Sequence, residues 1–215
     1  MRDLIIYGAS FLDCVKLVDA ANRARPTWRI RGFLDDTLAL QGKTLLGHRV
    51  LGGKERLAEL AADPQADLFN NVRGGWQRCQ LIAQRLREAG RDSVSLIHPA
   101  IDLAYVEHGP GCALSEGCVV AAMTRLGAYV TARVGCTISH DTTLEDYVLL
   151  GPGATIGSHV RIGARTLIGA GATVVTGITI GPGAIVAAGS LVSKDIEAGS
   201  HVAGVPARTV RSIGG

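Results

Sequence analysis

The chain has 215 residues, enough for one or two domains with hydrophobic cores of their own. Its net charge is only +3, with acidic and basic residues mixed, so it lacks the basic stripe that indicates nucleic-acid binding. The N-terminal segment has neither a long apolar run nor a small-residue cleavage site, which predicts a cytoplasmic protein.

The first hundred residues alternate between strand and helix patterns. Short apolar runs predict strands at 4–7, 28–34, 67–72 and 94–97. Helical spacing of apolar residues predicts helices at 11–23, 54–62 and 76–89. This order predicts a small parallel sheet flanked by helices, a Rossmann-like α/β domain over residues 1–100.

Ligands of such sheets bind at the carboxyl ends of the strands. Here these ends are the Gly8 loop, the Asp35-Asp36 pair and the turn at 73–75. The candidate substrate-binding residues are therefore Gly8, Ser10, Asp35, Asp36 and Arg73. As a phosphate-binding motif the loop is weak, because only the first glycine of Gly-x-Gly-x-x-Gly is present. The alternatives are a tight turn in which Ser10 caps the helix, and a solvated Asp35-Asp36 turn.

From residue 114 the sequence repeats every six residues. Between Leu114 and Val192, thirteen of the fourteen positions at this spacing are Leu, Ile or Val, and the exception is Ala132. A second row of compact or β-branched residues lies four positions after each step. A period of six fits neither an α-helix nor a single strand, and it predicts short parallel strands stacked as coils of a β-helix over residues 101–215.

If three hexads make one coil, Leu126, Leu144, Ile162 and Ile180 form one buried column. Cys118 and Cys136 are also eighteen residues apart in the second row, so we interpret them as structural rather than redox-active. The 27 uncharged residues at 166–192 are long enough for a membrane span. Their glycines, threonines, Pro182 and unbroken hexad register favour the interior of the coil, so no membrane span is predicted.

The densest group of titratable residues in the repeat surrounds His140. Asp141 follows it directly, and Glu145 and Asp146 lie in the next hexad. A neutral histidine is well matched to accepting a proton near pH 7, and an acidic neighbour fixes its tautomer. His140 is therefore the candidate general base, and a solvated corner histidine is the alternative. His159 lies about one coil further on, but without an evident third ligand we expect no metal site.

With these features in view, the chain resembles the bacterial hexapeptide-repeat acyltransferases. It is most similar to the branch in which a small nucleotide-binding domain precedes a left-handed β-helix: sugar-nucleotide N-acetyltransferases of the bacillosamine and perosamine pathways, and sialic-acid O-acetyltransferase-like proteins. The resemblance rests on Tyr7-Gly8-Ala9-Ser10, Phe33-Leu34-Asp35-Asp36, Leu96-Ile97-His98-Pro99, His140-Asp141 and Gly204-Val205-Pro206-Ala207.

The resemblance implies a homotrimer with active sites between adjacent β-helices. Acetyl-CoA would be the acyl donor, His140 the base and Asp141 the residue that raises its basicity. Gly169, Ala170, Ala188 and Gly189 match the family's acetyl-CoA contacts, and Lys194, Arg208 and Arg211 are candidates for the CoA phosphates. The acceptor would be a nucleotide-linked amino sugar used in surface-polysaccharide or glycan biosynthesis, acetylated on its amino group.

The residues leave several alternatives open. The family has Gly and His after the serine and a further Gly beyond them, where this chain has Phe11, Leu12 and Asp13. This departure leaves nucleotide binding open, with a different sugar nucleotide, a free sugar or another small molecule as alternative acceptors. O-acetylation of a sugar hydroxyl is an alternative to N-acetylation. A metal-dependent hydratase on the same scaffold would need a third imidazole, and a non-catalytic β-helix scaffold would not bind acetyl-CoA.

Overall fold

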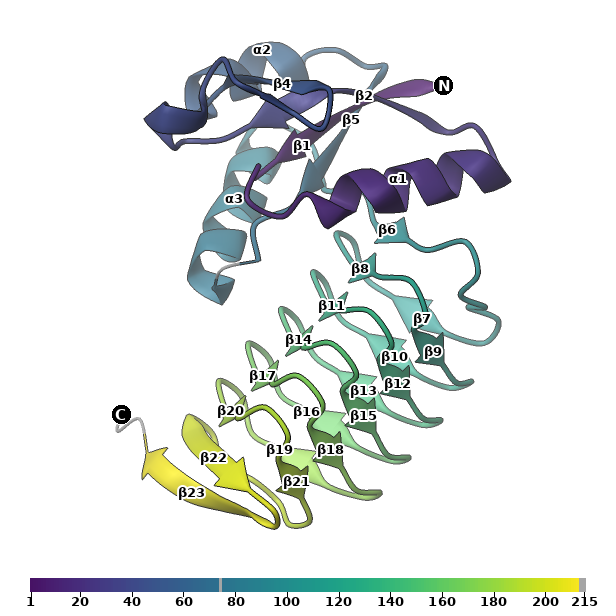
Figure 1. Cartoon of the computed structure of the whole chain (residues 1–215), viewed down its shortest axis with the longest axis vertical. Coiled ribbons are helices and arrows are strands. Elements are labelled where there is room, and N and C mark those ends of the chain that lie inside the picture. Colours follow the sequence, from purple (N-terminus) through teal and green to yellow (C-terminus); the bar gives the residue numbers. More distant parts are fainter. Residues whose placement is uncertain (74, 213–215) are drawn as a thin grey trace. The chain divides into compact units, whose positions relative to one another are not determined.

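A computed structural model describes residues 1–73 and 75–212 and shows two compact units, Met1–Pro99 and a second unit that begins at Ala100 (Figure 1). Gly74, part of the predicted ligand turn at 73–75, lies outside the described residues. Among the described residues, no helix has both the length and the apolar character of a membrane span.

The first unit is a five-stranded sheet with helices. Its order is β3-β4-β2-β1-β5, parallel throughout except for β3, which is antiparallel to β4. The strands are β1 (Arg2–Tyr7), β2 (Trp28–Leu34), β3 (Thr44–Leu45), β4 (His48–Gly52) and β5 (Ala66–Asn70). The helices are α1 (Asp13–Ala24), α2 (Leu57–Ala61) and α3 (Trp76–Glu88), with 3-10 turns η1 (Leu38–Leu40) and η2 (Lys54–Arg56). The core between sheet and helices includes Ile5, Leu34, Leu68 and Leu86.

Three details of this unit differ from the prediction. The hairpin of β3 and β4 was not predicted, because each strand is short and the segment has little apolar alternation. The predicted strand at 94–97 is reduced to β6 (Leu96–Ile97), which is not one of the five strands of this sheet. Helix α1 starts at Asp13 with Leu12 at its N-cap, and no side chain caps it, so the alternative of a Ser10 cap is wrong.

The second unit is a β-helix with three faces (Figure 1). The first face contains β7 (Glu107–His108), β10 (Arg125–Leu126), β13 (Thr143–Leu144), β16 (Arg161–Ile162) and β19 (Thr179–Ile180). The second contains β8 (Ala113–Leu114), β11 (Thr131–Ala132), β14 (Leu149–Leu150), β17 (Leu167–Ile168), β20 (Ile185–Val186), β22 (Ser200–Gly204) and β23 (Ala207–Ser212). The third contains β9 (Val119–Val120), β12 (Thr137–Ile138), β15 (Thr155–Ile156), β18 (Thr173–Val174) and β21 (Leu191–Val192).

The hexad register is confirmed residue by residue. Leu126 pairs with Leu144, Leu144 with Ile162, and Ile162 with Ile180, so three hexads make one coil. All fourteen residues of the main row are buried, and Ala132 is among them. The second row is buried as well, except that Ile196 at its end is only half-buried. Each buried aliphatic side chain contributes about 1.5–3 kcal/mol, and this replaces a conventional aromatic core.

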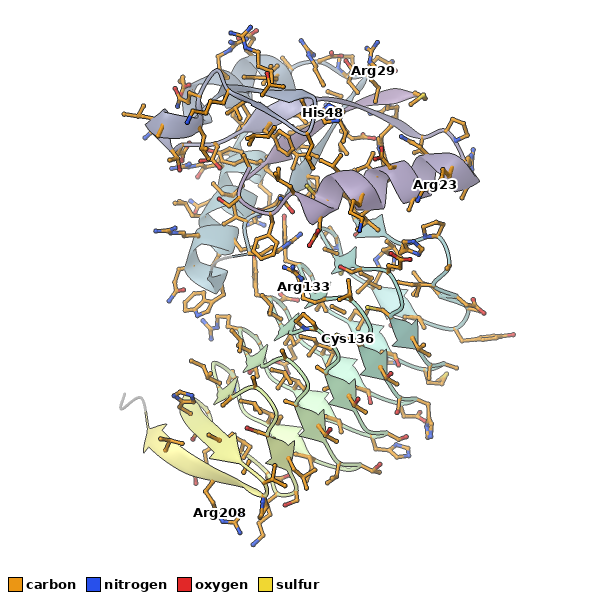
Figure 2. All side chains as sticks on the ribbon, in the orientation of Figure 1. Arg23, Arg29, His48, Arg133, Cys136 and Arg208 are labelled. Carbon is orange, nitrogen blue, oxygen red and sulfur yellow. The ribbon has the colours of Figure 1, made fainter. Side chains whose placement is uncertain are left out.

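The cysteines of the coil are part of this packing. Cys118 and Cys136 lie on adjacent coils, and their thiols donate to the carbonyl oxygens of Arg133 (3.0 Å) and Gly151 (3.1 Å), respectively. Interaction with the Cys118 thiol, together with burial, raises the pKa of the Cys136 thiol, so Cys136 stays protonated. Figure 2 labels Cys136 on its coil, and Arg208 on the C-terminal hairpin in which β23 runs antiparallel to β22.

Candidate functional site

His140 lies at a corner where the chain leaves β12 on the third face and enters β13 on the first face. We call the stacked residues 139–141 and 157–159 the histidine corner. Asp141 holds this corner with a φ of +56°, in the left-handed region, which a short polar residue adopts more readily than most. Thr142, buried just behind, donates a hydrogen bond to the carbonyl oxygen of Gly157 on the next coil (2.9 Å) and so ties the two coils together.

The two side chains at this corner contact each other directly. The His140 Nδ1 atom lies 2.7 Å from Asp141 Oδ2, and the side chains remain 56% and 43% exposed, respectively. In the neutral ring, Nδ1–H donates to the carboxylate, which leaves a lone pair on Nε2. The pair therefore has the arrangement of a general base whose tautomer is fixed by an acid.

His159 occupies the next coil of the same corner. Its ring is perpendicular to that of His140, with centroids 5.2 Å apart. Its backbone N–H donates to the His140 carbonyl oxygen (3.2 Å). Donor atoms of His140, Asp141 and His159 all lie within 4.8 Å of one another, so these three residues form a group that could hold a metal ion.

The four candidate cofactor-binding residues lie together on a different corner, between the second and third faces. We call residues 169–171 and 187–189 the alanine corner. The Gly189 N–H donates to the Ala170 carbonyl oxygen (2.8 Å), so the two turns are in register one coil apart. Ala170, Ala188 and Gly189 are exposed and Gly169 is half-buried. Small side chains leave the backbone of this corner open to close approach by a ligand.

The structure therefore does not bring the base and the candidate cofactor residues to one corner of the same chain. The histidine and alanine corners border opposite edges of the third face. Of the three outlying cations, Lys194 and Arg208 are exposed. The side chain of Arg211 lies outside the described side chains.

In the first unit, all five candidate substrate-binding residues come together. They line a cavity of about 420 Å³ at the carboxyl ends of β1, β2 and β5. Its wall comprises Tyr7, Gly8, Ser10, Phe11, Asp35, Asp36, Thr37, Asn71, Val72, Arg73, Arg78, Leu81 and Ile82. A cavity of this size at this place in an open parallel sheet can hold a small molecule.

Both aspartates of this cavity already hold parts of the protein. Asp35 is buried, and its carboxylate accepts from the N–H groups of Ala9 (2.8 Å) and Thr37 (2.9 Å), which fixes two loops of the rim. Asp36 accepts from the Tyr7 hydroxyl (2.8 Å) and from Arg85 (2.6 Å). Both carboxylates were predicted to accept hydrogen bonds from a ligand. Only the lone pairs that are not used by these internal hydrogen bonds can do so.

The contacts of Asp36 and Tyr7 also shift their ionisation. Burial raises the pKa of the Asp36 carboxyl, but the hydrogen bonds from Arg85, Tyr7 and the Lys54 backbone outweigh it and hold this pKa below its usual value. Burial and the bond to Asp36 raise the pKa of the Tyr7 hydroxyl. At neutral pH, Asp36 is thus an anion and Tyr7 a neutral donor at the wall of the cavity.

Gly8 and Arg73 are each held at the cavity by a contact within the first unit. Gly8 has a φ of +107°, and a Cβ there would lie 3.0 Å from the side chain of Val72. The Arg73 guanidinium lies over the Phe69 ring, 5.1 Å from its centroid. Arg73 is thus a cation held at the cavity by an aromatic ring.

Sequence reasoning missed Asn71, which organises the loop. Its side-chain amide donates to the carbonyl oxygens of Gly8 (2.9 Å) and Phe11 (2.8 Å). It also missed Tyr7 and Arg85, whose hydroxyl and guanidinium are 2.9 Å apart. The position of Asn71 near the carboxyl end of the predicted strand at 67–72 was a usable signal, whereas the reach of Arg85 from α3 left no signal in the sequence.

Comparison with known proteins connects both units to one class. Residues 159–194 match the family model for the hexapeptide repeat of succinyl-transferase. The structure of a perosamine N-acetyltransferase variant from Caulobacter crescentus, with CoA and GDP-perosamine, is 27% identical and has a TM-score of 0.88 over 98% of both chains. The acetyltransferase domain of PglB from Neisseria gonorrhoeae, with acetyl coenzyme A, is 27% identical, with a TM-score of 0.86 over 97% of this chain and 99% of that one.

A third similar structure is WeeI from Acinetobacter baumannii, at 25% identity and a TM-score of 0.82, covering 98% of this chain and 100% of that one. A search of the curated proteins found no match. The fold and the repeat define an acyltransferase built on a left-handed hexapeptide-repeat β-helix. Within that class, the chain is similar over 98% of its length, with the α/β unit ahead of the coil included, to a perosamine N-acetyltransferase.

Proposed function

We propose that the chain transfers an acetyl group from acetyl-CoA to the amino group of a nucleotide-linked amino sugar, in bacterial surface-polysaccharide or glycan biosynthesis. The observation that carries the proposal is the 2.7 Å contact between His140 and Asp141 on an exposed corner of an acyltransferase β-helix. Perosamine N-acetyltransferase and the PglB domain, both similar over nearly their whole lengths, have been solved with CoA or acetyl-CoA. The former also holds GDP-perosamine.

The chemistry follows from the tautomer of His140. Its Nε2 lone pair takes the proton from the acceptor amine as the nitrogen attacks the thioester carbonyl carbon. Asp141 stabilises the imidazolium that forms, a backbone amide near the corner stabilises the oxyanion, and the C–S bond breaks to release the CoA thiolate. The imidazolium then returns its proton to the thiolate. This sequence requires no covalent acyl-enzyme.

We further propose a homotrimer in which each active site combines two chains. In one chain the histidine and alanine corners lie on opposite edges of the third face, so one coil cannot present both to the same thioester. If adjacent chains face each other, the histidine corner of one meets the alanine corner of the next. A ring of this kind is a closed heterologous assembly, for which three-fold symmetry is a common solution.

The cavity of the first unit is the proposed site for the nucleotide part of the acceptor. It presents the cations of Arg73 and Arg78 and the remaining lone pairs of Asp36, whereas the single hydrogen of the Tyr7 hydroxyl is already donated to Asp36. Asp13 begins the first turn of α1, where a phosphate would otherwise be favoured. We therefore assign the phosphates to the side of the arginines rather than to the start of this helix.

An O-acetyltransferase on a sugar hydroxyl would use the same base and the same donor, so the acceptor must be established by experiment. The test is release of CoA, followed by mass spectrometry, with acetyl-CoA and a panel of nucleotide amino sugars and their hydroxyl counterparts. His140→Ala should reduce turnover by roughly 10²–10⁴ while leaving the fold intact. The matched control is His108→Ala, because His108 is exposed on the first face and lies away from this corner. Wild-type turnover of folded His140→Ala would refute the proposal.

The shared site has its own test by complementation. His140→Ala and Ala188→Trp would each be inactive alone, the second because a bulky ring blocks the alanine corner. Unfolding and reassembling an equal mixture should restore about a quarter of wild-type activity, since that fraction of sites pairs an intact histidine with an intact alanine corner. A mixture as inactive as its components would show that each site belongs to one chain.

A further inference from the structure

We propose that His140, Asp141 and His159 form a binding site for Zn²⁺, and that the bound ion blocks His140 as a base. The three residues come from two successive coils of one corner, and one donor atom of each lies within 4.8 Å of the others. The blocking of His140 rests on the proposed function, whereas the binding of the ion does not.

The donor set suits this ion. Two imidazole nitrogens and one carboxylate oxygen are the ligands of many catalytic zinc sites, in which the fourth position of the tetrahedron holds water. Zinc–ligand bonds of about 2.0–2.2 Å require donor atoms a little closer together than 4.8 Å. All three side chains are exposed, so their χ angles can adjust by that amount without disturbing the buried rows of the coil.

The backbone of this corner sets where the His159 ring lies. His159 has a φ of +56°, and the equivalent residues of the preceding coils, Tyr105, Met123 and Asp141, have φ values of +61°, +61° and +56°. The left-handed backbone is therefore a property of the corner in every coil. What distinguishes His159 is its imidazole, which this backbone holds perpendicular to the ring of the candidate base, with centroids 5.2 Å apart.

The ion and the proton compete for the same atoms. In the metal-free corner, Asp141 accepts the hydrogen bond from His140 Nδ1, and the lone pair that would act as the base is on Nε2. A bound Zn²⁺ takes a lone pair of His140 and an oxygen of Asp141. No proton can then be removed by that ring, so zinc acts as a reversible inhibitor that is displaced by a chelator.

The decisive experiment measures binding without any substrate. Titration calorimetry of the metal-free, full-length protein with ZnCl₂ should give one ion per chain, and MgCl₂ should give none, because Mg²⁺ prefers oxygen ligands. Co²⁺ in place of zinc should produce the visible absorption of a tetrahedral site. The probe variant is His159→Asn, since asparagine tolerates the left-handed backbone and removes the imidazole. The matched control is His108→Asn.

We expect His159→Asn and His140→Asn each to weaken zinc binding by more than about tenfold, with His108→Asn unchanged. Unaltered affinity in His159→Asn, or no stoichiometric binding by the wild type, would overturn the site. Inhibition is measured within each variant as the ratio of the acetyl-transfer rates with and without ZnCl₂. Stoichiometric zinc without inhibition would overturn the blocking role. A protein that binds zinc but transfers no acetyl group would leave the site standing and refute the proposed function instead.

Discussion

Gly169 lies directly against the backbone of Ala188 on the next coil. A Cβ at Gly169 would come within 2.4 Å of the Ala188 amide nitrogen, closer than any real contact. We predict that Gly169→Ala lowers the free energy of unfolding by about 1–3 kcal/mol, because the clash is with backbone and cannot be relieved by a rotamer change. Thermal unfolding followed by circular dichroism in the strand region measures the effect.

Gly171→Asn is the matched control for that substitution. Gly171, unlike Gly169, has a positive φ, +64°, but nothing lies within 4 Å of a Cβ built there. Asparagine tolerates this backbone, so the control should lose less stability than Gly169→Ala. Equal losses would contradict a cost that comes from the short distance between the coils at Gly169.

Replacing Asp141 with asparagine should impair proton transfer without moving the corner. Asparagine tolerates the left-handed backbone of this position, but its amide can donate to His140 Nδ1 and so favour the tautomer with the proton on Nε2. We expect kcat to fall by roughly 10–10⁴, as in other acid–histidine pairs that lose their tautomer. Steady-state kinetics measure this. Asp195→Asn is the control, because Asp195 instead accepts from the Thr179 backbone N–H. Unchanged kcat in Asp141→Asn would contradict the role.

A charge in the middle of the coil should be intolerable. Ile162 is fully buried and pairs with Leu144 and Ile180 on the neighbouring coils. Ile162→Asp should cost at least about 3 kcal/mol and either unfold the β-helix or disperse its oligomer. Light scattering and circular dichroism report on both. Thr155→Asp places the same side chain on an outward position of β15 and should leave the melting temperature nearly unchanged. A variant of Ile162 with the wild-type melting temperature and particle size would refute this placement.

The Asp36 network predicts a pH dependence of stability in the first unit. The folded-state pKa of Asp36 is depressed, so its contribution is present above the ordinary aspartate pKa of 3.8 and is lost as the pH falls through the folded-state value. Asp36→Asn should therefore destabilise this unit at pH 7 and differ progressively less from wild type below about pH 4. Both tryptophans, Trp28 and Trp76, lie in this unit, so their fluorescence follows its unfolding alone. A difference that stays constant with pH would exclude an ionic origin.

The β-helix could be predicted from the sequence because its core is a one-dimensional pattern. Every third hexad stacks on the last, so spacing alone fixed which residues are buried, and even Ala132 follows the rule. The first unit was harder to predict, because its core depends on contacts between segments far apart. The pairing of β4 with β2 left no periodic signal in so short a segment.

The site shows the same limit. The sequence places His140 next to Asp141, and that contact is local. The perpendicular contact with His159 depends on how the corners of two successive coils stack. Counting residues places His159 only about one coil after His140, so the contact between the rings could not be predicted. The engagement of Asp36 by Tyr7 and Arg85 spans 49 residues, so the carboxylate was expected to be free. Side-chain partners that meet only through tertiary folding leave no pattern to read.

The C-terminal hairpin gives the stack of coils an end. Parallel strands expose unpaired amide and carbonyl groups at the last turn, and such an edge can recruit a strand from another molecule. On the second face, β23 folds back antiparallel onto β22 and uses those groups itself. The hairpin thereby covers the edge of the last coil on this face, which works against the addition of another molecule and the growth of a fibre along the axis of the β-helix.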